Sequence, residues 1–371
     1  MEASIGDDRL ALASRPKGLV PFHAYDDGEV RTAFEEHLVE AAHVVRSRDG
    51  RCRLHFTVSA EHLDGFAARL REVGARYAAR FDVSFDVSYS VQKPSTDTIA
   101  VDPEDRPFRT EAGRILFRPG GHGALIENLD DLQGDIVLIK NIDNVQRDRD
   151  RETAAVWKRL LVGSLVRVQA SAYEALHRLK SNPRPKRAAL DEVATFVRDE
   201  FGVAPPRHGA GLDARRLRTW LSDRLERPLR VCGVVPNTGE PGGGPFWVRD
   251  GEGSISPQII ETAQVDPGSD RQQRVLARAS HFNPVDLVCG LRDAAGEPYV
   301  LQPLVDADSV IVTRKTVGGR TVKALERPGL WNGAMAGWNT VFVEVPGETF
   351  SPVKTVVDLL RPEHRPRSGH A

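Results

Sequence analysis

Alternation of apolar and polar residues marks several strands in the first 150 residues. Residues 51–59 and 82–92 alternate, and residues 135–143 form a nearly continuous apolar run, so each stretch predicts a β-strand. Residues 29–43 and 61–76 carry apolar positions at helical spacing and predict amphipathic helices. A short strand at 114–117 precedes a Gly-rich turn and a helix-compatible segment. This order of elements predicts a doubly wound α/β sheet.

The first of these helices has a sequence signal for its start. Thr32 is followed three residues later by Glu35. A Ser or Thr followed at this spacing by Glu forms a capping box, in which each side chain accepts a hydrogen bond from the other residue's backbone N–H. We therefore expect Thr32 to cap the helix.

The pattern changes at about residue 151. Helical spacing dominates residues 154–180, 188–201 and 213–225, with Pro-containing breaks at 181–186 and 203–207. These features predict a helical insertion, residues 151–226, that packs on the sheet domain. Its charged residues are typical of a solvated face rather than of a binding patch. Strand-like segments resume at 229–235, and a further strand is expected at 340–345.

Composition narrows the class of protein. A chain of 371 residues with 40% hydrophobic residues suits one large α/β unit with insertions, or two domains. The formal net charge of −1 argues against a general affinity for nucleic acid or anionic membranes. No run approaches the roughly 18 apolar residues of a membrane span. The first residues lack the apolar core of a signal peptide, so the cytoplasm is the expected location.

The cysteines do not suggest a disulfide framework or a metal site. Cys52, Cys232 and Cys289 are far apart in the sequence and lie in apolar surroundings. An odd number of cysteines at such spacings fits neither paired disulfides nor a zinc pattern. We expect three buried structural thiols.

A Gly-rich turn and the apolar run that follows it carry the first candidate chemistry. The turn contains Gly120, Gly121, His122 and Gly123, and the apolar run ends in Asp143. Backbone N–H groups in such a turn can hold phosphate oxygens, and the helix behind it favours anions. An acidic residue after a buried strand can hold a divalent metal on those phosphates. The hypothesis from these residues is a nucleotide-phosphate site.

The lysines offer an independent indication. Only nine of the 51 basic residues are lysines, so the surviving lysines are candidates for positions that require a compact point charge. Lys17, Lys140 and Lys354 all fall in motif-like stretches.

Five segments together resemble the UDP-sugar pyrophosphorylases, which are sugar-phosphate nucleotidylyltransferases of the GT-A-like α/β class. Residues 119–123 form a Pro-x-Gly-His-Gly loop, and residues 139–144 form a strand ending in Asp-Asn. Residues 260–265 read Ile-Glu-Thr-Ala-Gln-Val, and residues 282–287 read Phe-Asn-Pro-Val-Asp-Leu. Residues 343–360 form a closing Glu-Val-Pro…Pro-Val-Lys-Thr…Asp-Leu-Leu stretch. The resemblance covers about residues 15–364. The chain also resembles a bacterial family described only as a domain of unknown function.

The resemblance implies a three-layer, Rossmann-like fold of the GT-A nucleotidyltransferase type, in which helices flank a mixed sheet. Residues 15–150 would then form the nucleotide-binding half and residues 227–360 the sugar-binding half, on either side of the helical insertion. Residues 361–371 are polar and are expected to form a disordered tail.

The resemblance also implies a reaction and its site residues. A sugar 1-phosphate would attack the α-phosphorus of a nucleoside triphosphate, with UTP favoured, and release pyrophosphate with the help of Mg²⁺. Nucleotide, sugar phosphate and Mg²⁺ are therefore the expected partners. Lys17 and Lys354 would contact phosphates and Asp143 would hold the metal. The nucleotide would be bound by Gly120, Gly121, His122, Gly123 and Gln92, and the sugar by Glu261, Asn283 and Asp286.

Two other functions remain open. This superfamily normally begins with a Gly-rich triphosphate loop of the type Gly-x-Gly-Thr-Arg, and no such loop precedes Lys17. Either the start is truncated, or part of the nucleotide cradle has been lost and the protein binds nucleotide or sugar without turnover. A GT-A-type glycosyltransferase would need an Asp-x-Asp motif, whereas Asp143 is followed by Asn144 and Val145. The loop at 239–244 is a candidate lid or sugar-binding loop, and Trp331 and Trp338 are expected in the core.

Overall fold

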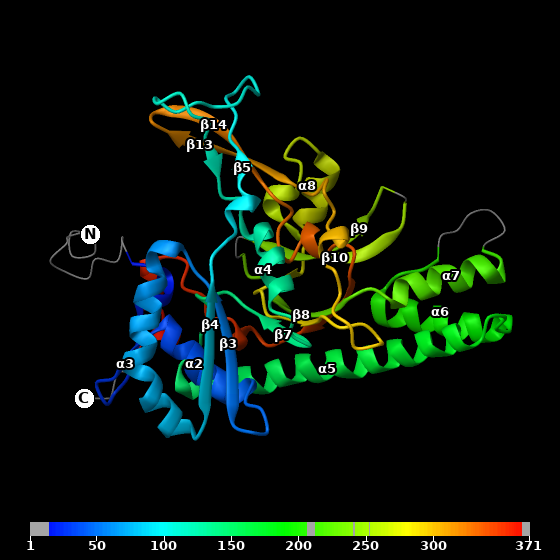
Figure 1. Cartoon of the computed structure of the whole chain (residues 1–371), viewed down its shortest axis with the longest axis horizontal. Helices are drawn as coiled ribbons and strands as arrows, with labels where there is room; N and C mark the ends of the chain where they lie inside the picture. The colour runs from blue at the N-terminus through cyan, green and yellow to red at the C-terminus, as the bar shows by residue number, and fades with distance from the viewer. Residues whose placement is uncertain (1–14, 206–211, 240–241, 252, 366–371) are drawn as a thin grey trace. The chain divides into compact units, whose positions relative to one another are not determined.

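The computed structural model describes residues 15–205, 212–239, 242–251 and 253–365 (Figure 1). The chain forms two compact units, each built from separated segments. Unit 1 contains residues up to 91, 140–160 and the residues from 345 onward, and unit 2 contains residues 92–139 and 161–344.

Unit 1 begins with an antiparallel hairpin and continues as a β-α-β arrangement. The hairpin consists of β1 (Pro21–Ala24) and β2 (Val30–Thr32) and leads into α2 (Ala33–Val44). β3 (Arg51–Thr57) and β4 (Ser84–Ser90) pair in parallel and are joined by α3 (Leu63–Phe81). Apolar side chains of α2, β3 and α3 form one core cluster. The strands and helices expected in this region are confirmed, with ends that shift by a few residues.

Helix α2 starts where the sequence predicts. The Thr32 side chain accepts a hydrogen bond from the backbone N–H of Glu35, and the Glu35 carboxylate accepts one from the backbone N–H of Thr32. This reciprocal pair satisfies two N–H groups that would otherwise lack helical partners. The predicted capping box is confirmed.

The buried face of α2 is unusual because it carries ionisable groups. Glu35, Glu36 and Glu40 are all buried. Each has cationic partners: Glu35 pairs with arginines of α3, Glu36 with Arg151, and Glu40 with Lys140 and Lys158. Buried carboxylates are stable only when they are paired and hydrogen-bonded. Helix α2 therefore links distant parts of unit 1 through charge pairs.

Unit 2 is organised around a mixed sheet. Its strand order is β11–β8–β12–β7, and β15 also pairs with β8. The β15–β8 pairing is parallel and the others are antiparallel. The strand bounds are His281–Phe282 for β11, Leu229–Pro236 for β8, Leu287–Gly290 for β12, Ile136–Ile139 for β7 and Asn339–Glu344 for β15. The expected mixed α/β class, with strands at 229–235 and 340–345, is confirmed.

Smaller elements of unit 2 surround this sheet. β5 (Thr98–Ile99) pairs with β6 (Phe117–Arg118), β9 (Gly243–Arg249) with β10 (Ile255–Glu261), and β13 (Ile311–Val317) with β14 (Arg320–Glu326). Two short helices, α4 (Ile126–Asp131) and α8 (Asp270–Leu276), complete the unit. Trp338 is fully buried, and Trp331 packs against apolar clusters, as expected.

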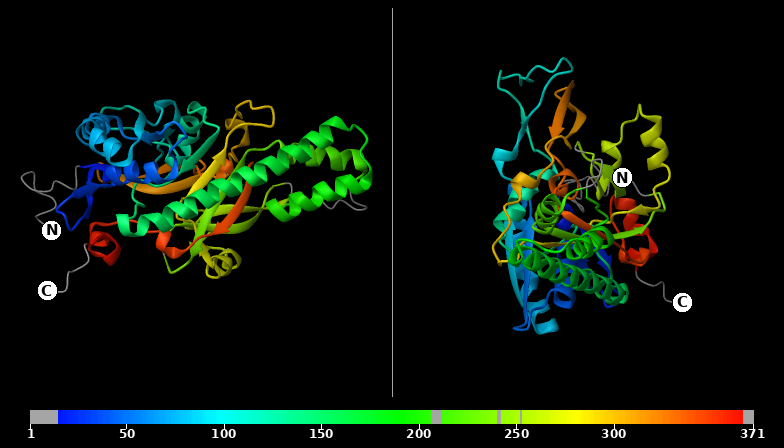
Figure 2. Two further views of the ribbon diagram at one scale, coloured as in Figure 1. Left: turned by 90° about the horizontal axis from the view of Figure 1, so that it is seen from below. Right: turned by 90° about the vertical axis from the view of Figure 1, so that its right-hand side faces the viewer.

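Three helices occupy the region predicted to be helical. α5 (Asp148–Ser181) runs across the division between the units, and α6 (Arg187–Phe201) and α7 (Ala214–Leu225) follow it. Both later helices contact the C-terminal half of α5, through an Arg167–Glu200 ion pair and an Arg218 bond to the Leu179 carbonyl (Figure 2). Within the described residues, no helix is long and apolar enough to cross a membrane.

Three expectations need correction or restriction. The strand expected to reach Asp143 ends at Ile139, because β7 pairs with β12 only over Ile136–Ile139. The C-terminal tail is not irregular from residue 361, since Pro362–His364 form a 3₁₀ turn with His364 buried; residues 366–371 lie outside the described residues. The glycines at 243 and 244 belong to β9 rather than to a loop, and residues 240–241 lie outside the described residues.

Candidate functional site

Unit 1 brings together three of the predicted site residues. The Lys17 ammonium lies 2.9 Å from Asp143 Oδ2, and the Lys354 ammonium lies 3.3 Å from the same oxygen and 3.5 Å from Oδ1. The Asp143 side chain is 8% exposed, whereas those of Lys17 and Lys354 are 40% and 46% exposed. A buried carboxylate thus holds two solvent-accessible cations side by side, although the three residues are far apart in the sequence.

Helix α2 fixes the loop that carries Asp143. His37 Nε2 donates to the carbonyl of Ile142 at 3.1 Å, which requires the proton on Nε2. Lys140 donates to both carboxylate oxygens of Glu40, at 2.9 and 2.8 Å. Lys140 is therefore held in a buried ion pair rather than presented to solvent. These two contacts flank Asp143 and limit the movement of its backbone.

The C-terminal segment presents Lys354 to the same carboxylate. The Ser351 N–H donates to Asn144 Oδ1 at 3.0 Å, and the Val353 N–H donates to the Asp143 carbonyl at 3.0 Å. Asp358 Oδ2 accepts the backbone N–H of Lys354 at 2.9 Å. Backbone contacts on both sides of Lys354 thus hold it in place.

Lys17, Asp143 and Lys354 carry two positive charges and one negative charge, which suits phosphate with a metal more than a metal alone. Asp143 is a single carboxylate, and within the described residues no group of three or more His, Cys, Asp or Glu side chains could form a metal cage. Mg²⁺ often binds through one or two carboxylates and takes its other ligands from water and substrate phosphates. Asp143 therefore fits a Mg²⁺ ion that arrives with phosphate, while Lys17 and Lys354 would neutralise phosphate oxygens.

Unit 2 holds the Gly-rich turn and His122. The turn follows β6 and leads into a 3₁₀ turn, His122–Leu125, and then α4, as the sequence predicts. A Cβ atom at Gly123 would lie 2.1 Å from the carbonyl oxygen of Pro328. The Gly120 carbonyl accepts the N–H of Arg327 at 2.8 Å. The backbone of residues 327–328, in the same unit, therefore lies closer to this turn than a residue with a Cβ atom would permit.

The contacts of His122 define its tautomer. The backbone N–H of Leu330 donates to His122 Nδ1 at 3.0 Å, so Nδ1 is an acceptor and the neutral ring carries its proton on Nε2. That nitrogen faces Glu261 Oε1 at 3.4 Å. The ring also stacks on Trp331, with centroids 4.1 Å apart and an interplanar angle of 16°. The imidazole is thus held flat, with a defined donor edge.

Glu261, the last residue of β10, contacts both His122 and Trp331. Its Oε1 accepts the indole N–H of Trp331 at 3.1 Å as well as facing His122. The hydrogen bond from His122 lowers the pKa of the Glu261 carboxyl, against the opposing effect of burial. Glu261 is therefore an anion at neutral pH, and its side chain is 23% exposed. We call His122, Glu261 and Trp331 the His122 group.

The other predicted residues of unit 2 lie apart from these contacts. Asn283 is buried and uses its amide for the backbone, donating to the Gly233 carbonyl and accepting the Val285 N–H. Asp286 is also buried. Among the described hydrogen bonds, none joins Gln92 to the His122 group. The structure thus groups Glu261 with His122, but it gives Asn283 a role in its own turn.

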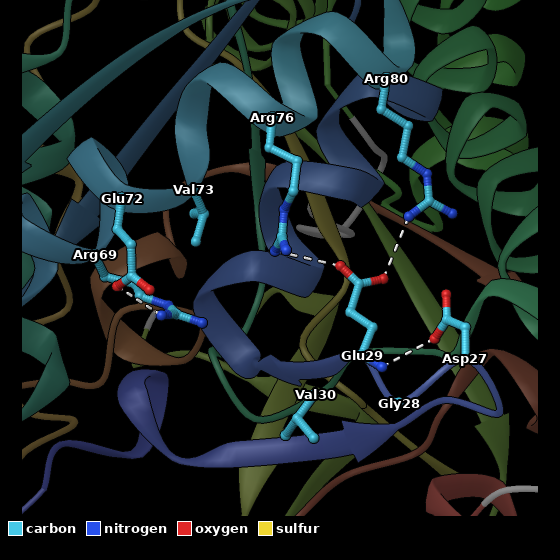
Figure 3. A pocket seen from close by; sticks show the side chains of 9 residues that line it. All are labelled: Asp27, Gly28, Glu29, Val30, Arg69, Glu72, Val73, Arg76 and Arg80. Atoms are coloured by element: carbon cyan, nitrogen blue, oxygen red, sulfur yellow. Dashed lines mark hydrogen bonds and ion pairs between the residues drawn. The ribbon is translucent and has the colours of Figure 1, made fainter.

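A separate pocket of about 670 Å³ lies in unit 1 between α3 and the β1–β2 turn (Figure 3). Three arginines of α3 line it, but all three already pair with carboxylates: Arg69 with Glu72 and Glu35, Arg76 with Glu29 and Glu35, and Arg80 with Glu29. None of its lining residues belongs to the predicted site. Its cations are balanced by neighbouring acids, so it lacks the unmatched positive charge of an anion site.

Sequence reasoning missed the residues that support the site. His37 and Glu40 were assigned only to a helix, and Trp331 only to the core. Their partners, Ile142, Lys140 and His122, lie at least 100 residues away in the sequence. The only local signal was the concentration of acidic residues on an otherwise apolar helix face, at Glu35, Glu36 and Glu40.

Comparison with known proteins identifies the family and the fold. A family model described as a domain of unknown function, DUF4301, matches residues 1–365. A search of curated proteins finds no match. Among solved structures, a mutant UDP-glucose pyrophosphorylase from Leishmania major, in complex with UDP-glucose, is similar with a TM-score of 0.50 and 16% identity. The match covers 93% of this chain and 61% of that one.

Two further structures are similar at lower TM-scores. One is a UDP-glucose phosphorylase from Trypanosoma brucei, with 18% identity, a TM-score of 0.45 and coverage of 93% of this chain and 60% of that one. The other is described as a UDP-N-acetylglucosamine pyrophosphorylase from Entamoeba histolytica, with 11% identity, a TM-score of 0.48 and coverage of 93% and 72%. At 16% identity, the match to the Leishmania protein speaks to fold alone. The chain spans about three fifths of the length of the Leishmania protein.

Proposed function

We propose that this chain, which belongs to the DUF4301 family, is a nucleotidylyltransferase that joins a nucleoside triphosphate to a sugar 1-phosphate and releases pyrophosphate. The observation that carries the proposal is the placement of Lys17 and Lys354 on one buried carboxylate, Asp143. The sequence resemblance to UDP-sugar pyrophosphorylases and the shared fold support it, and UTP is the favoured nucleotide. A cytoplasmic location remains a prediction.

The chemistry assigned to unit 1 is charge neutralisation. Phosphoryl and nucleotidyl transfer require alignment and stabilisation of charge more than covalent help from the protein. Lys17 and Lys354 would each exchange part of their contact with Asp143 for phosphate oxygens, and both side chains are exposed enough to do so. When bound at Asp143, Mg²⁺ would supply further neutralisation of the phosphates. The attacking phosphate is already anionic, so no general base is required.

The chemistry assigned to unit 2 is recognition. The His122 group offers a ring held flat on Trp331, an Nε2–H donor and the Glu261 carboxylate. A carboxylate can accept two hydrogen bonds from neighbouring sugar hydroxyls, and an imidazole can stack on, or donate to, a ligand. We therefore assign nucleotide recognition to the turn at 120–123 through its His122 ring, and sugar recognition to Glu261.

The test is pyrophosphate release over a panel of nucleoside triphosphates and sugar 1-phosphates, with and without Mg²⁺. We expect release with at least one pair, and a loss of at least about a hundredfold in Asp143→Ala and Lys354→Ala, as for removal of a charged group that stabilises the transition state. Lys180→Ala is the matched control, because Lys180 forms an exposed ion pair with Glu226. Absence of turnover with every pair, together with nucleotide-dependent thermal stabilisation, would instead indicate a binding protein.

A further inference from the structure

A buried arginine holds the backbone beside the His122 group. Arg230 lies on β8 and is completely buried. Its Nη1 donates to the carbonyl oxygen of Trp331 at 2.6 Å, its Nε to Thr340 Oγ1 at 2.9 Å, and its Nη2 to Gln258 Oε1 at 3.0 Å. All three acceptors are neutral. The guanidinium therefore donates to the turn that contains Trp331 and to the side chains of Thr340 on β15 and Gln258 on β10.

This arrangement is energetically expensive for a purely structural element. Within the described part of the chain, no carboxylate forms an ion pair with the Arg230 guanidinium, and burial lowers the pKa of Arg230. Removing an unpaired cation from water costs several kcal/mol, and an apolar residue in β8 would avoid that cost. A role in placing the Trp331 carbonyl accounts for a cation at this position.

The Trp331 carbonyl belongs to the turn that controls His122. The residue before Trp331, Leu330, gives its N–H to His122 Nδ1, and the Trp331 indole stacks on the ring and donates to Glu261. Gly329 begins this turn, and a Cβ atom there would lie 2.6 Å from His122 Cε1. A shift of the turn by a few tenths of an ångström would therefore disturb both the Nδ1 hydrogen bond and the stacking.

We propose that Arg230 is a positioning residue for the recognition site: by holding the Trp331 carbonyl, it keeps His122 in the Nε2–H tautomer with its donor edge toward Glu261. This inference rests on the proposed function for its consequence, ligand recognition, but its structural part stands independently. Arg230 is completely buried and would act through the Trp331 carbonyl. A Lys at 230 would retain the charge but could not reach three acceptors with one planar fork.

The first test requires no ligand. Long-range ¹H–¹⁵N NMR of the whole chain distinguishes the two neutral tautomers of a histidine ring, and His122→Gln identifies the His122 signals. We expect the Nε2–H form in the wild type and a mixture of tautomers in Arg230→Lys. Thr340→Val is the control, because it removes the acceptor of Nε and leaves the bond to Trp331. An unchanged His122 spectrum in Arg230→Lys, or an equal change in Thr340→Val, would overturn the proposal.

The second test measures recognition with UDP-glucose as the probe. We expect Arg230→Lys to raise the dissociation constant for UDP-glucose about tenfold, which corresponds to the loss of about one charge-assisted hydrogen bond. Thr340→Val should bind UDP-glucose nearly as tightly as the wild type does. If no variant binds UDP-glucose, the proposed function loses support but the tautomer result still decides the role of Arg230. If Arg230→Lys does not fold, Arg230→Met decides instead, because it removes the donor to the Trp331 carbonyl without leaving a buried charge: a mixture of His122 tautomers supports the role, and an unchanged Nε2–H form contradicts it.

Discussion

Two buried neutral histidines of unit 1 should make its stability depend on pH above the range in which carboxylates titrate. Burial, reinforced by the Lys140 ammonium, lowers the pKa of His37 to about 3. Burial also lowers the pKa of His364 to about 4, with His23 and Arg361 acting in the same direction. Each ring is neutral in the folded protein at pH values where the unfolded chain would bind a proton.

The change of unfolding free energy with pH follows from the difference in proton binding between the folded and unfolded chains. The unfolded histidines protonate below pH 6.5, while the folded ones do not until about pH 3 and 4, so acid favours the unfolded chain. Each pH unit corresponds to about 1.4 kcal/mol for each ring. Between pH 7.5 and 4.5, His37 should cost about 2.7 kcal/mol and His364 about 2.5 kcal/mol, or about 5 kcal/mol together.

The carboxylates do not obscure this window. Burial alone would raise the pKa of Glu36, but the hydrogen bond from His23 and the charge of Arg151 lower it to about 2. A depressed carboxyl pKa contributes stability above about pH 4.5 that is lost only as pH falls toward 2. The Glu36 contribution is therefore constant between pH 6.5 and 4.5.

Urea unfolding at several pH values between 7.5 and 4.5 measures the effect. His37→Gln is the informative variant, because its amide can still donate to the Ile142 carbonyl but cannot bind a proton. We expect the pH-dependent loss of unfolding free energy to be smaller in His37→Gln than in the wild type by about 2.7 kcal/mol. An identical pH dependence in the two proteins would show that burial does not keep the His37 ring neutral in the folded protein.

Two other substitutions test the packing and the site separately. Gly123→Ala should destabilise the protein by about 1–3 kcal/mol, because the new Cβ would lie 2.1 Å from the Pro328 carbonyl oxygen and force the backbone to shift. Thermal unfolding measures this loss. Gly163→Ala is the control, because a Cβ at that position meets nothing within 4 Å. Asp358→Ala removes the acceptor of the Lys354 N–H. It should lower kcat for pyrophosphate release about tenfold while costing only about 1 kcal/mol of stability. An unchanged kcat would show that Lys354 needs no such support.

Local chemistry made parts of the fold predictable. The capping box at Thr32 and Glu35 depends on residues three positions apart, so the sequence contains the whole signal. The helices within α5, α6 and α7 likewise follow from helical spacing and Pro-containing breaks. The structure brings Lys17, Asp143 and Lys354 together, and each lies in a segment that resembles a known family; their roles stay a prediction.

Features that depend on distant partners escaped prediction. The apolar run 135–143 looked like one strand, but only its first half finds a strand partner, and His37 holds the rest as a loop. Helical spacing alone did not show that the carboxylates of α2 are buried, because their cations, Arg151, Lys140 and Lys158, come from other segments. Neither effect can be derived from local spacing.

The bond that breaks in a nucleotide sugar distinguishes a nucleotidylyltransferase from a glycosyltransferase. UDP-glucose and pyrophosphate are incubated with the protein and Mg²⁺, and the products are followed by ³¹P NMR. A nucleotidylyltransferase running in reverse cleaves between the two phosphorus atoms, so we predict UTP and glucose 1-phosphate, formed only when pyrophosphate is present and not by Asp143→Ala. Formation of UDP instead would show cleavage at the sugar carbon, as in a glycosyltransferase, and would contradict the proposed reaction.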